Sequence, residues 1–188
     1  EGVPKKYNDK IVQVGNIVRE EIINSNIVKE NTNNFGVIKI LVLGGSQAAQ
    51  IFGELLPKVF EELKKNNLSI KIYQQCQKRQ NEYLSNFYKN KGIDYEVFNF
   101  TDKIMNYYNK ANLVITRAGA SVLGELINVN IPFISIPLPT SKDNHQLKNA
   151  QFYEKKGYGY LIEEKDIKNK LYDLIHSISK NKILLKNI

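Results

Sequence analysis

The chain has 188 residues, enough for one α/β domain with a substantial core but too few for a two-domain enzyme. Hydrophobic residues make up 42% and charged residues 24%, which excludes an intrinsically disordered protein. A single cysteine, Cys76, excludes an internal disulfide, and the two histidines, His145 and His176, are too few and too distant for a structural zinc site. We therefore expect neither a metal nor a cofactor.

A net charge of +8 is compatible with nucleic-acid binding, but the kind of basic residue argues against it. Only Arg19, Arg79 and Arg117 are arginines, whereas proteins that read phosphates and bases favour the bidentate fork of arginine. No apolar run reaches the roughly 18 residues of a membrane span, and the first residues lack the apolar core of a signal peptide. We expect a cytoplasmic protein without a nucleic-acid partner.

In chain order, the first predicted strand is 11–14, directly before Gly15. The stretch 24–34 is polar and rich in asparagine, so we predict the end of a helix and a mobile loop there. Five short apolar runs follow, and their continuous β-branched character is typical of strands buried on both faces in a parallel sheet. These runs are 39–43, 68–73, 95–98, 113–116 and 131–136.

Segments with helical spacing of apolar residues accompany these strands. The helical stripes are Ile51, Leu55, Val59 and Leu63 in the first segment, Ile104, Tyr107 and Tyr108 in another, and Ile167, Leu171, Leu174, Ile175 and Ile178 in the tail from Lys165. This alternation predicts an α/β fold, a Rossmann-like doubly wound parallel sheet. Such sheets bind ligands at the carboxyl ends of their strands, so the candidate site residues are those that follow strands.

The first candidate loop, 44–49, follows the strand that ends at Leu43 and leads into a helix from Gln50. Its glycine pair allows close approach of the backbone to a ligand, and the N-terminus of the next helix can bind a diphosphate. Ser46 can add a hydroxyl donor. A tight strand-to-helix turn with Ser46 as N-cap is an equally good interpretation of this loop alone.

The second candidate loop, 117–126, follows the strand that ends at Thr116. Gly119 and Ala120 are predicted to begin a helix, with Glu125 on its second turn. A carboxylate there can accept both hydroxyls of a ribose, as acidic residues commonly do in nucleotide sites. The alternatives are an exposed helical acid for Glu125 and a surface ion pair for Arg117.

The third candidate loop, 137–150, follows the last apolar run, and its two prolines end that strand. His145 and Asn149 are four residues apart and share one face of the predicted helix, and Gln146 lies beside them. Neutral donors and acceptors of this kind suit the hydroxyls of a sugar. A histidine on a helix surface without a ligand is the alternative.

These three loops, together with Val14-Gly15-Asn16-Ile17-Val18-Arg19 upstream, resemble the C-terminal domain of the MurG family of bacterial peptidoglycan N-acetylglucosaminyltransferases. The resemblance runs over nearly the whole chain. It implies that residues 1–188 form the UDP-N-acetylglucosamine-binding domain, the C-terminal half of a GT-B glycosyltransferase, and that the N-terminal acceptor-binding domain is absent from this chain. The full enzymes transfer N-acetylglucosamine, with inversion, to undecaprenyl-pyrophosphoryl-muramyl-pentapeptide and are peripheral on the cytoplasmic face of the inner membrane.

The resemblance also implies roles for single residues. The residues near the diphosphate are Gly45, Ser46 and Gln47, with Ala120 facing the phosphates and Arg19 reaching toward the donor. The uracil contacts are Phe100 and Thr101, the ribose contact is Glu125, and the contacts to the sugar are His145, Gln146 and Asn149. The catalytic base is expected in the missing half, so this chain alone should bind donor without completing transfer.

Four residues depart from the family pattern: Ala48 and Gln77 replace glycines, Gln74 replaces a histidine, and Val122 replaces a threonine. None of these changes affects Glu125 or Gln146. Three other functions remain open from the sequence: a donor-binding subunit that acts with a separate partner, a UDP-sugar epimerase, and a non-catalytic nucleotide-sugar-binding protein.

Overall fold

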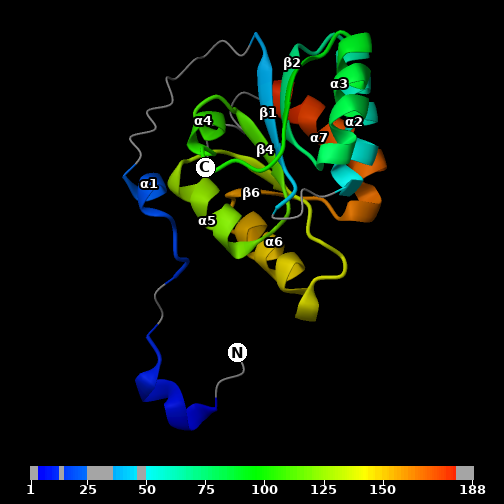
Figure 1. The fold of residues 1–188 in the computed structure, drawn as a ribbon. Helices are drawn as coiled ribbons and strands as arrows, with labels where there is room; N and C mark the ends of the chain where they lie inside the picture. Colours follow the sequence, from blue (N-terminus) through cyan, green and yellow to red (C-terminus); the bar gives the residue numbers. More distant parts are fainter. Residues whose placement is uncertain (1–3, 13–14, 25–35, 46–49, 181–188) are drawn as a thin grey trace.

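A computed structural model describes residues 4–12, 15–24, 36–45 and 50–180. Six parallel strands form one sheet in the order β3-β2-β1-β4-β5-β6, the order of a Rossmann fold (Figure 1). The strands are β1 (Ile38–Leu43), β2 (Ile70–Gln75), β3 (Asp94–Phe98), β4 (Leu113–Thr116), β5 (Phe133–Ser135) and β6 (Gly159–Leu161). The α-helices are α1 (Glu20–Ile23), α2 (Gln50–Lys65), α3 (Asn81–Asn90), α4 (Met105–Tyr108), α5 (Ala120–Asn128), α6 (His145–Lys155) and α7 (Ile167–Lys180). The short 3-10 helices are η1 (Lys5–Lys10), η2 (Lys78–Gln80), η3 (Lys142–Asn144) and η4 (Glu164–Asp166).

Helices cover both faces of the sheet, and the alternation of side chains along each strand divides the core into two parts. In β1, Ile40 and Val42 lie in the part that α2, α3 and α7 cover, whereas Leu41 and Leu43 lie in the part that α4, α5 and α6 cover. Figure 1 shows α2, α3 and α7 together on one side of the sheet and α4, α5 and α6 on the other. Because both faces of the central strands are covered, β4 and β5 are buried along their whole length and β1 is buried at every position but Lys39, which matches the apolar runs in the sequence.

The five predicted apolar strands and the doubly wound parallel sheet are confirmed, with ends that differ by one or two residues. The predicted strand 11–14 is wrong for Ile11 and Val12, which belong to no strand and are 49% and 80% exposed. Residues 13 and 14 lie outside the described residues, as does nearly all of the loop predicted at 24–34. The edge strand β6 was not predicted, because it has only three residues, all half-buried.

The helical stripes are confirmed for α4 and α7, and in α2 the predicted Val59 and Leu63 are buried. The first part of α2 differs from the prediction, because Phe52 and Leu56 are 0% exposed whereas the predicted Ile51 and Leu55 are only half-buried. The buried side chains of α2 pack in the same part of the core as α7 and the strands. Among the described residues, no helix is long and apolar enough to cross a bilayer.

A buried polar pair joins β2 to α3 in this core. The hydroxyl of Tyr88 donates to Oε1 of Gln74 at 2.5 Å, and both side chains are 0% exposed. Burial raises the pKa of Tyr88, so its hydroxyl remains a neutral donor. The amide nitrogen Nε2 of Gln74 has no hydrogen-bond partner among the described residues. An unpaired buried donor costs about 1–3 kcal/mol, so this pair is a weak point of the core.

We predict that removing the Tyr88 hydroxyl alone destabilises the protein, and that also removing the Gln74 amide restores the lost stability. Tyr88→Phe alone should lower the free energy of unfolding by about 1–3 kcal/mol, because it leaves the whole Gln74 amide unpaired. The double variant Gln74→Met, Tyr88→Phe should be at least as stable as the parent, since methionine has a similar volume. Urea unfolding measures both values, and a double variant no more stable than Tyr88→Phe alone would contradict the prediction.

Candidate nucleotide-sugar site

A pocket of about 330 Å³ opens at the carboxyl ends of the central strands. It lies between β1 and β4, where the strand order reverses and where open α/β sheets bind their ligands. Its lining includes five predicted site residues: Arg19, Gly45, Phe100, Thr101 and Glu125. The other lining residues are Leu43, Gln75, Asp102, Ile104, Tyr108, Thr116 and Val122.

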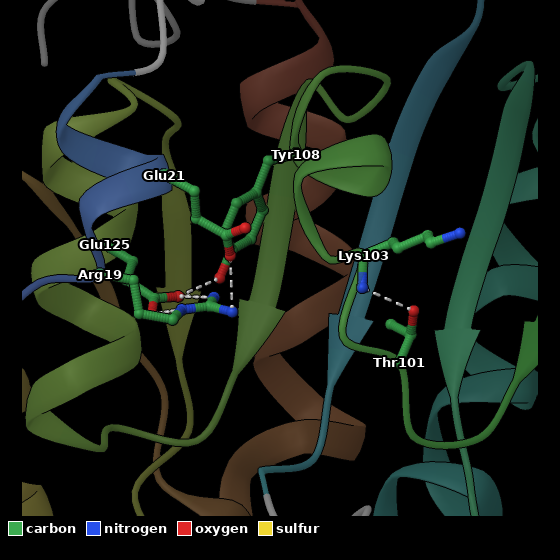
Figure 2. Close-up of polar contacts among 6 residues, drawn as sticks. All are labelled: Arg19, Glu21, Thr101, Lys103, Tyr108 and Glu125. Carbon is green, nitrogen blue, oxygen red and sulfur yellow. Dashed lines mark hydrogen bonds and ion pairs between the residues drawn. The ribbon is translucent and has the colours of Figure 1, made fainter.

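Glu125 is the central charged group of this pocket. It lies on α5 and is only 8% exposed, so the alternative of an exposed helical acid is wrong. Arg19 donates from Nε to Oε1 at 2.8 Å and from Nη2 to Oε2 at 3.0 Å, and the Tyr108 hydroxyl donates to Oε2 at 2.9 Å. Figure 2 shows the guanidinium and the phenol converging on the carboxylate. A buried carboxylate needs such partners, because burial of an unpaired charge is costly.

The protonation states in this network follow from the contacts. The hydrogen bond to Glu125 raises the pKa of Arg19, so the guanidinium remains charged. Burial, and then the nearby Glu125 carboxylate, raise the pKa of Tyr108 well above its ordinary value. Tyr108 is therefore a neutral donor at every physiological pH. The Glu125 carboxylate thus accepts from one cation and one neutral hydroxyl, and the same cation also pairs with Glu21 at 2.9 Å.

The segment before the sheet carries Arg19 into the pocket. Asn16 donates from Nδ2 to the hydroxyl of Tyr153 at 2.7 Å and to the carbonyl of Ala120 at 3.3 Å. It lies so close to Gly124 that a Cβ there would meet the Asn16 side chain at 3.0–3.1 Å. Ile22, on α1, is 1% exposed in the same part of the core as α5. This segment therefore packs along α5 and places the guanidinium over Glu125.

The loop between β3 and α4 forms another wall. Asn99 anchors its start, because its amide donates to the carbonyl of Cys76 at 2.9 Å and to Oδ1 of Asn81 at 3.0 Å. The Thr101 hydroxyl accepts from the backbone N–H of Lys103 at 3.0 Å, a contact that Figure 2 also shows. Phe100 is 85% exposed although it lines the pocket. The loop thus holds a fixed backbone beside a large exposed ring.

The loop after β1 begins at the floor of the pocket. Gln75 accepts through Oε1 from the backbone N–H of Gly44 at 3.2 Å, which ties β2 to the start of this loop. Gly45 has a φ of +77°, a conformation that L side chains rarely adopt, so glycine is required there by the backbone. The predicted phosphate contacts Ser46 and Gln47, as well as Ala48, lie outside the described residues.

The remaining predicted residues lie outside the lining of this pocket: Ala120, His145, Gln146 and Asn149. His145 and Asn149 do lie on one helix, α6, as predicted. Asn149 donates to the carbonyl of Ala118 at 3.1 Å, and Gln146 accepts from the N–H of Leu138 at 3.0 Å. Each amide thus uses one of its two polar groups to fasten α6 to a neighbouring loop. Nδ1 of His145 lies 2.8 Å from the carbonyl of Lys142.

Arg117 is buried, so its interpretation as a surface ion pair is only half right. It pairs with Glu164 in η4, but it is 8% exposed. Its Nη1 also donates to the carbonyls of Ile136 and Pro137, and its guanidinium lies 4.7 Å from the ring centre of Phe52. Arg117 therefore joins β4, the end of β5, α2 and η4, and it is not part of the pocket lining.

Sequence reasoning missed three residues that build the site: Tyr108, Gln75 and Asn16. Tyr108 was predicted only as part of an apolar stripe, and its hydroxyl could have been suspected because a buried tyrosine usually pairs its hydroxyl. Gln75 ends a strand at the carboxyl edge, which is the general signal for a site residue. No group of three or more His, Cys, Asp or Glu among the described residues could hold a metal ion.

Residues 39–187 match the model of the glycosyltransferase family 28 C-terminal domain, and the chain belongs to this family. It is 39% identical to the UDP-N-acetylglucosamine--N-acetylmuramyl-(pentapeptide) pyrophosphoryl-undecaprenol N-acetylglucosamine transferase of Pelagibacter ubique, over 98% of this chain and 52% of that protein. The transferase of the same name from Rickettsia bellii is 36% identical, over 98% and 53%. The chain thus spans about half the length of these relatives.

A solved structure is also similar to this chain. The crystal structure of MurG from Acinetobacter baumannii superposes with a TM-score of 0.69 at 26% identity, covering 78% of this chain and 42% of that one. The expected fold, one half of a GT-B glycosyltransferase with a Rossmann-like sheet, is confirmed by this likeness and by the strand order.

We predict that Arg117 stabilises the fold that carries the site. Arg117→Met should lower the free energy of unfolding by about 2–4 kcal/mol, because two carbonyls and the Glu164 carboxylate lose a buried charged donor. Chemical denaturation measures the change. Arg79→Met is the matched control, since Arg79 is exposed and should contribute under about 0.5 kcal/mol. Equal stability of the two variants would show that the Arg117 contacts add nothing.

Proposed function

We propose that this chain binds UDP-N-acetylglucosamine as the donor half of an N-acetylglucosaminyltransferase that converts the lipid-linked muramyl-pentapeptide of peptidoglycan synthesis to its disaccharide form. The observation that carries the proposal is the oriented Glu125 carboxylate at the point where the strand order reverses. The names of the relatives support the donor and the acceptor, and they favour transfer over an epimerase or a binding protein.

The ribose of the donor binds at Glu125 in this proposal. A carboxylate can accept hydrogen bonds from two neighbouring hydroxyls, and such charge-assisted bonds are stronger than neutral ones. Glu125 is 8% exposed, which limits competition by water, and it lines the pocket. Its location after β4 is the one that Rossmann folds use for nucleotides.

The uracil and the diphosphate bind on either side of the ribose in this proposal. The uracil contacts the loop of Phe100 and Thr101, where the exposed ring can cover the base and the anchored backbone can read its edge. The diphosphate lies near Gly45, at the start of the loop that leads into α2. Helix α2 has sixteen residues, and the positive end of its dipole, at its N-terminus, faces this loop. His145, Gln146 and Asn149 on α6, with Ala120, extend the site toward the phosphates and the sugar.

The acceptor and the catalytic base belong to a half that this chain does not contain, so the chain binds donor without completing transfer. In the whole enzyme the acceptor hydroxyl displaces UDP, with inversion, and this half stabilises the departing diphosphate through backbone N–H groups and helix dipoles. We further propose that the whole enzyme works as a peripheral protein on the cytoplasmic face of the inner membrane. It needs no cofactor and no metal in this half.

Glu125→Gln tests the ribose contact. The amide keeps the shape but weakens one acceptor and replaces the other by a donor, so UDP affinity should fall about tenfold or more. Isothermal titration calorimetry measures the affinity, and the fold should survive. Glu62→Gln is the matched control, because Glu62 is an exposed acid on α2. Parent-like UDP binding by both variants would place the ribose elsewhere.

The base contact predicts a preference for uridine nucleotides. UDP should bind at least about tenfold more tightly than ADP, because a backbone edge shaped for a pyrimidine leaves polar groups of a purine unpaired. Competition calorimetry with both nucleotides measures the ratio. Equal affinities would mean that the loop of Phe100 and Thr101 does not read the base.

A further inference from the structure

The hydrogen bonds that Glu125 already accepts leave too few acceptor positions on its carboxylate for a ribose. A carboxylate offers about four acceptor positions. Arg19 occupies two of them and Tyr108 a third. A ribose brings two further donors, its neighbouring 2′ and 3′ hydroxyls, so the complete set exceeds what the carboxylate can accept. One of the present partners must therefore leave when the diol binds.

Burial decides which partner leaves. Tyr108 is 1% exposed, and its hydroxyl would be buried without a partner if it left Glu125. The Arg19 side chain is 44% exposed, so water can replace the carboxylate, and its Nη1 already pairs with Glu21 at 2.9 Å. Figure 2 shows Glu21 and Glu125 on two sides of the same guanidinium. Loss of the Arg19 contact is thus the less costly of the two.

We propose that Arg19 is an exchangeable cover on Glu125 that the ribose diol displaces, whereas Tyr108 is a positioning residue that holds the carboxylate with and without ligand. This inference rests on the proposed function. In the empty site Arg19 neutralises Glu125. After exchange, its charge stays at the wall of the pocket, which Gly45 also lines. One cation then serves the carboxylate in the empty site and the ligand's phosphates in the filled one.

Uridine, which has no phosphates, tests the displacement of Arg19 from Glu125 without any contribution from phosphate contacts. In the full 188-residue chain, Arg19→Met should tighten binding of uridine by about threefold to tenfold, because no ion pair has to break. It should change binding of 2′-deoxyuridine by less than about twofold, because a single hydroxyl fits beside Arg19 and Tyr108. NMR titration measures such weak affinities. Arg79→Met, at an exposed arginine outside the pocket lining, is the control and should change neither.

A second variant tests the fixed role of Tyr108. In a Tyr108→Phe background the carboxylate has room for both Arg19 and the diol, so adding Arg19→Met should no longer tighten uridine binding. Tyr107→Phe is the matched background, since Tyr107 is on the same helix but donates to Glu96 at 2.8 Å. There the tightening should persist. A tyrosine with a purely structural role would not remove the effect of a substitution at Arg19.

The possible results separate the two proposals. If the parent binds UDP but Arg19→Met weakens uridine binding or leaves it unchanged, Arg19 is not displaced by the ribose, and the proposed function stands. If Arg19→Met tightens uridine equally in both backgrounds, Tyr108 does not limit the carboxylate and the inference is also wrong. If the parent binds no uridine nucleotide at all, the proposed function fails, and the inference fails with it.

Discussion

A carboxylate that the fold buries must be given partners, and this constraint organises the site of the protein. Glu125 is 8% exposed at the centre of the pocket. An ion in this position is stable only with a charge or several donors beside it. Arg19, near the start of the chain, and Tyr108, just past its midpoint, meet this need from different elements. The site is thus already arranged around one acceptor before any ligand binds.

The sheet explains how partners so distant in sequence meet. Strand β4 leads into α5 with Glu125, β3 leads into α4 with Tyr108, and the segment packed on α5 carries Arg19. All of the strands are parallel, so the loops that follow them share one edge of the sheet. Arg117 stabilises that edge through its contacts with the end of β5, α2 and η4. One arginine, Arg117, therefore stabilises the fold, and another, Arg19, lines the pocket.

The sheet could be predicted from the sequence because parallel strands buried on both faces have nearly continuous apolar sequences. The same reasoning failed at Ile11 and Val12, whose apolar side chains lie exposed, and at β6, whose short half-buried sequence resembles a loop. Glu125 could be predicted from its place after a strand. The contact of the Tyr108 hydroxyl could not be predicted, because it depends on where the folded chain places α4 relative to Glu125, and helical spacing predicts only that the ring is buried. Two of the four departures from the family pattern have local effects: Gln74 accepts from Tyr88 inside the core, and Val122 lines the pocket with an apolar side chain.

The central claim is that the pocket at Glu125 holds the nucleoside of a UDP-sugar, and a crystal structure of this chain with UDP-N-acetylglucosamine tests it most directly. The account predicts the ribose hydroxyls within hydrogen-bond distance of Glu125, the uracil against the loop of Phe100 and Thr101, and Tyr108 still bonded to the carboxylate. A nucleotide bound elsewhere, or bound with Glu125 still covered by Arg19 and without contact to the ribose, would contradict it.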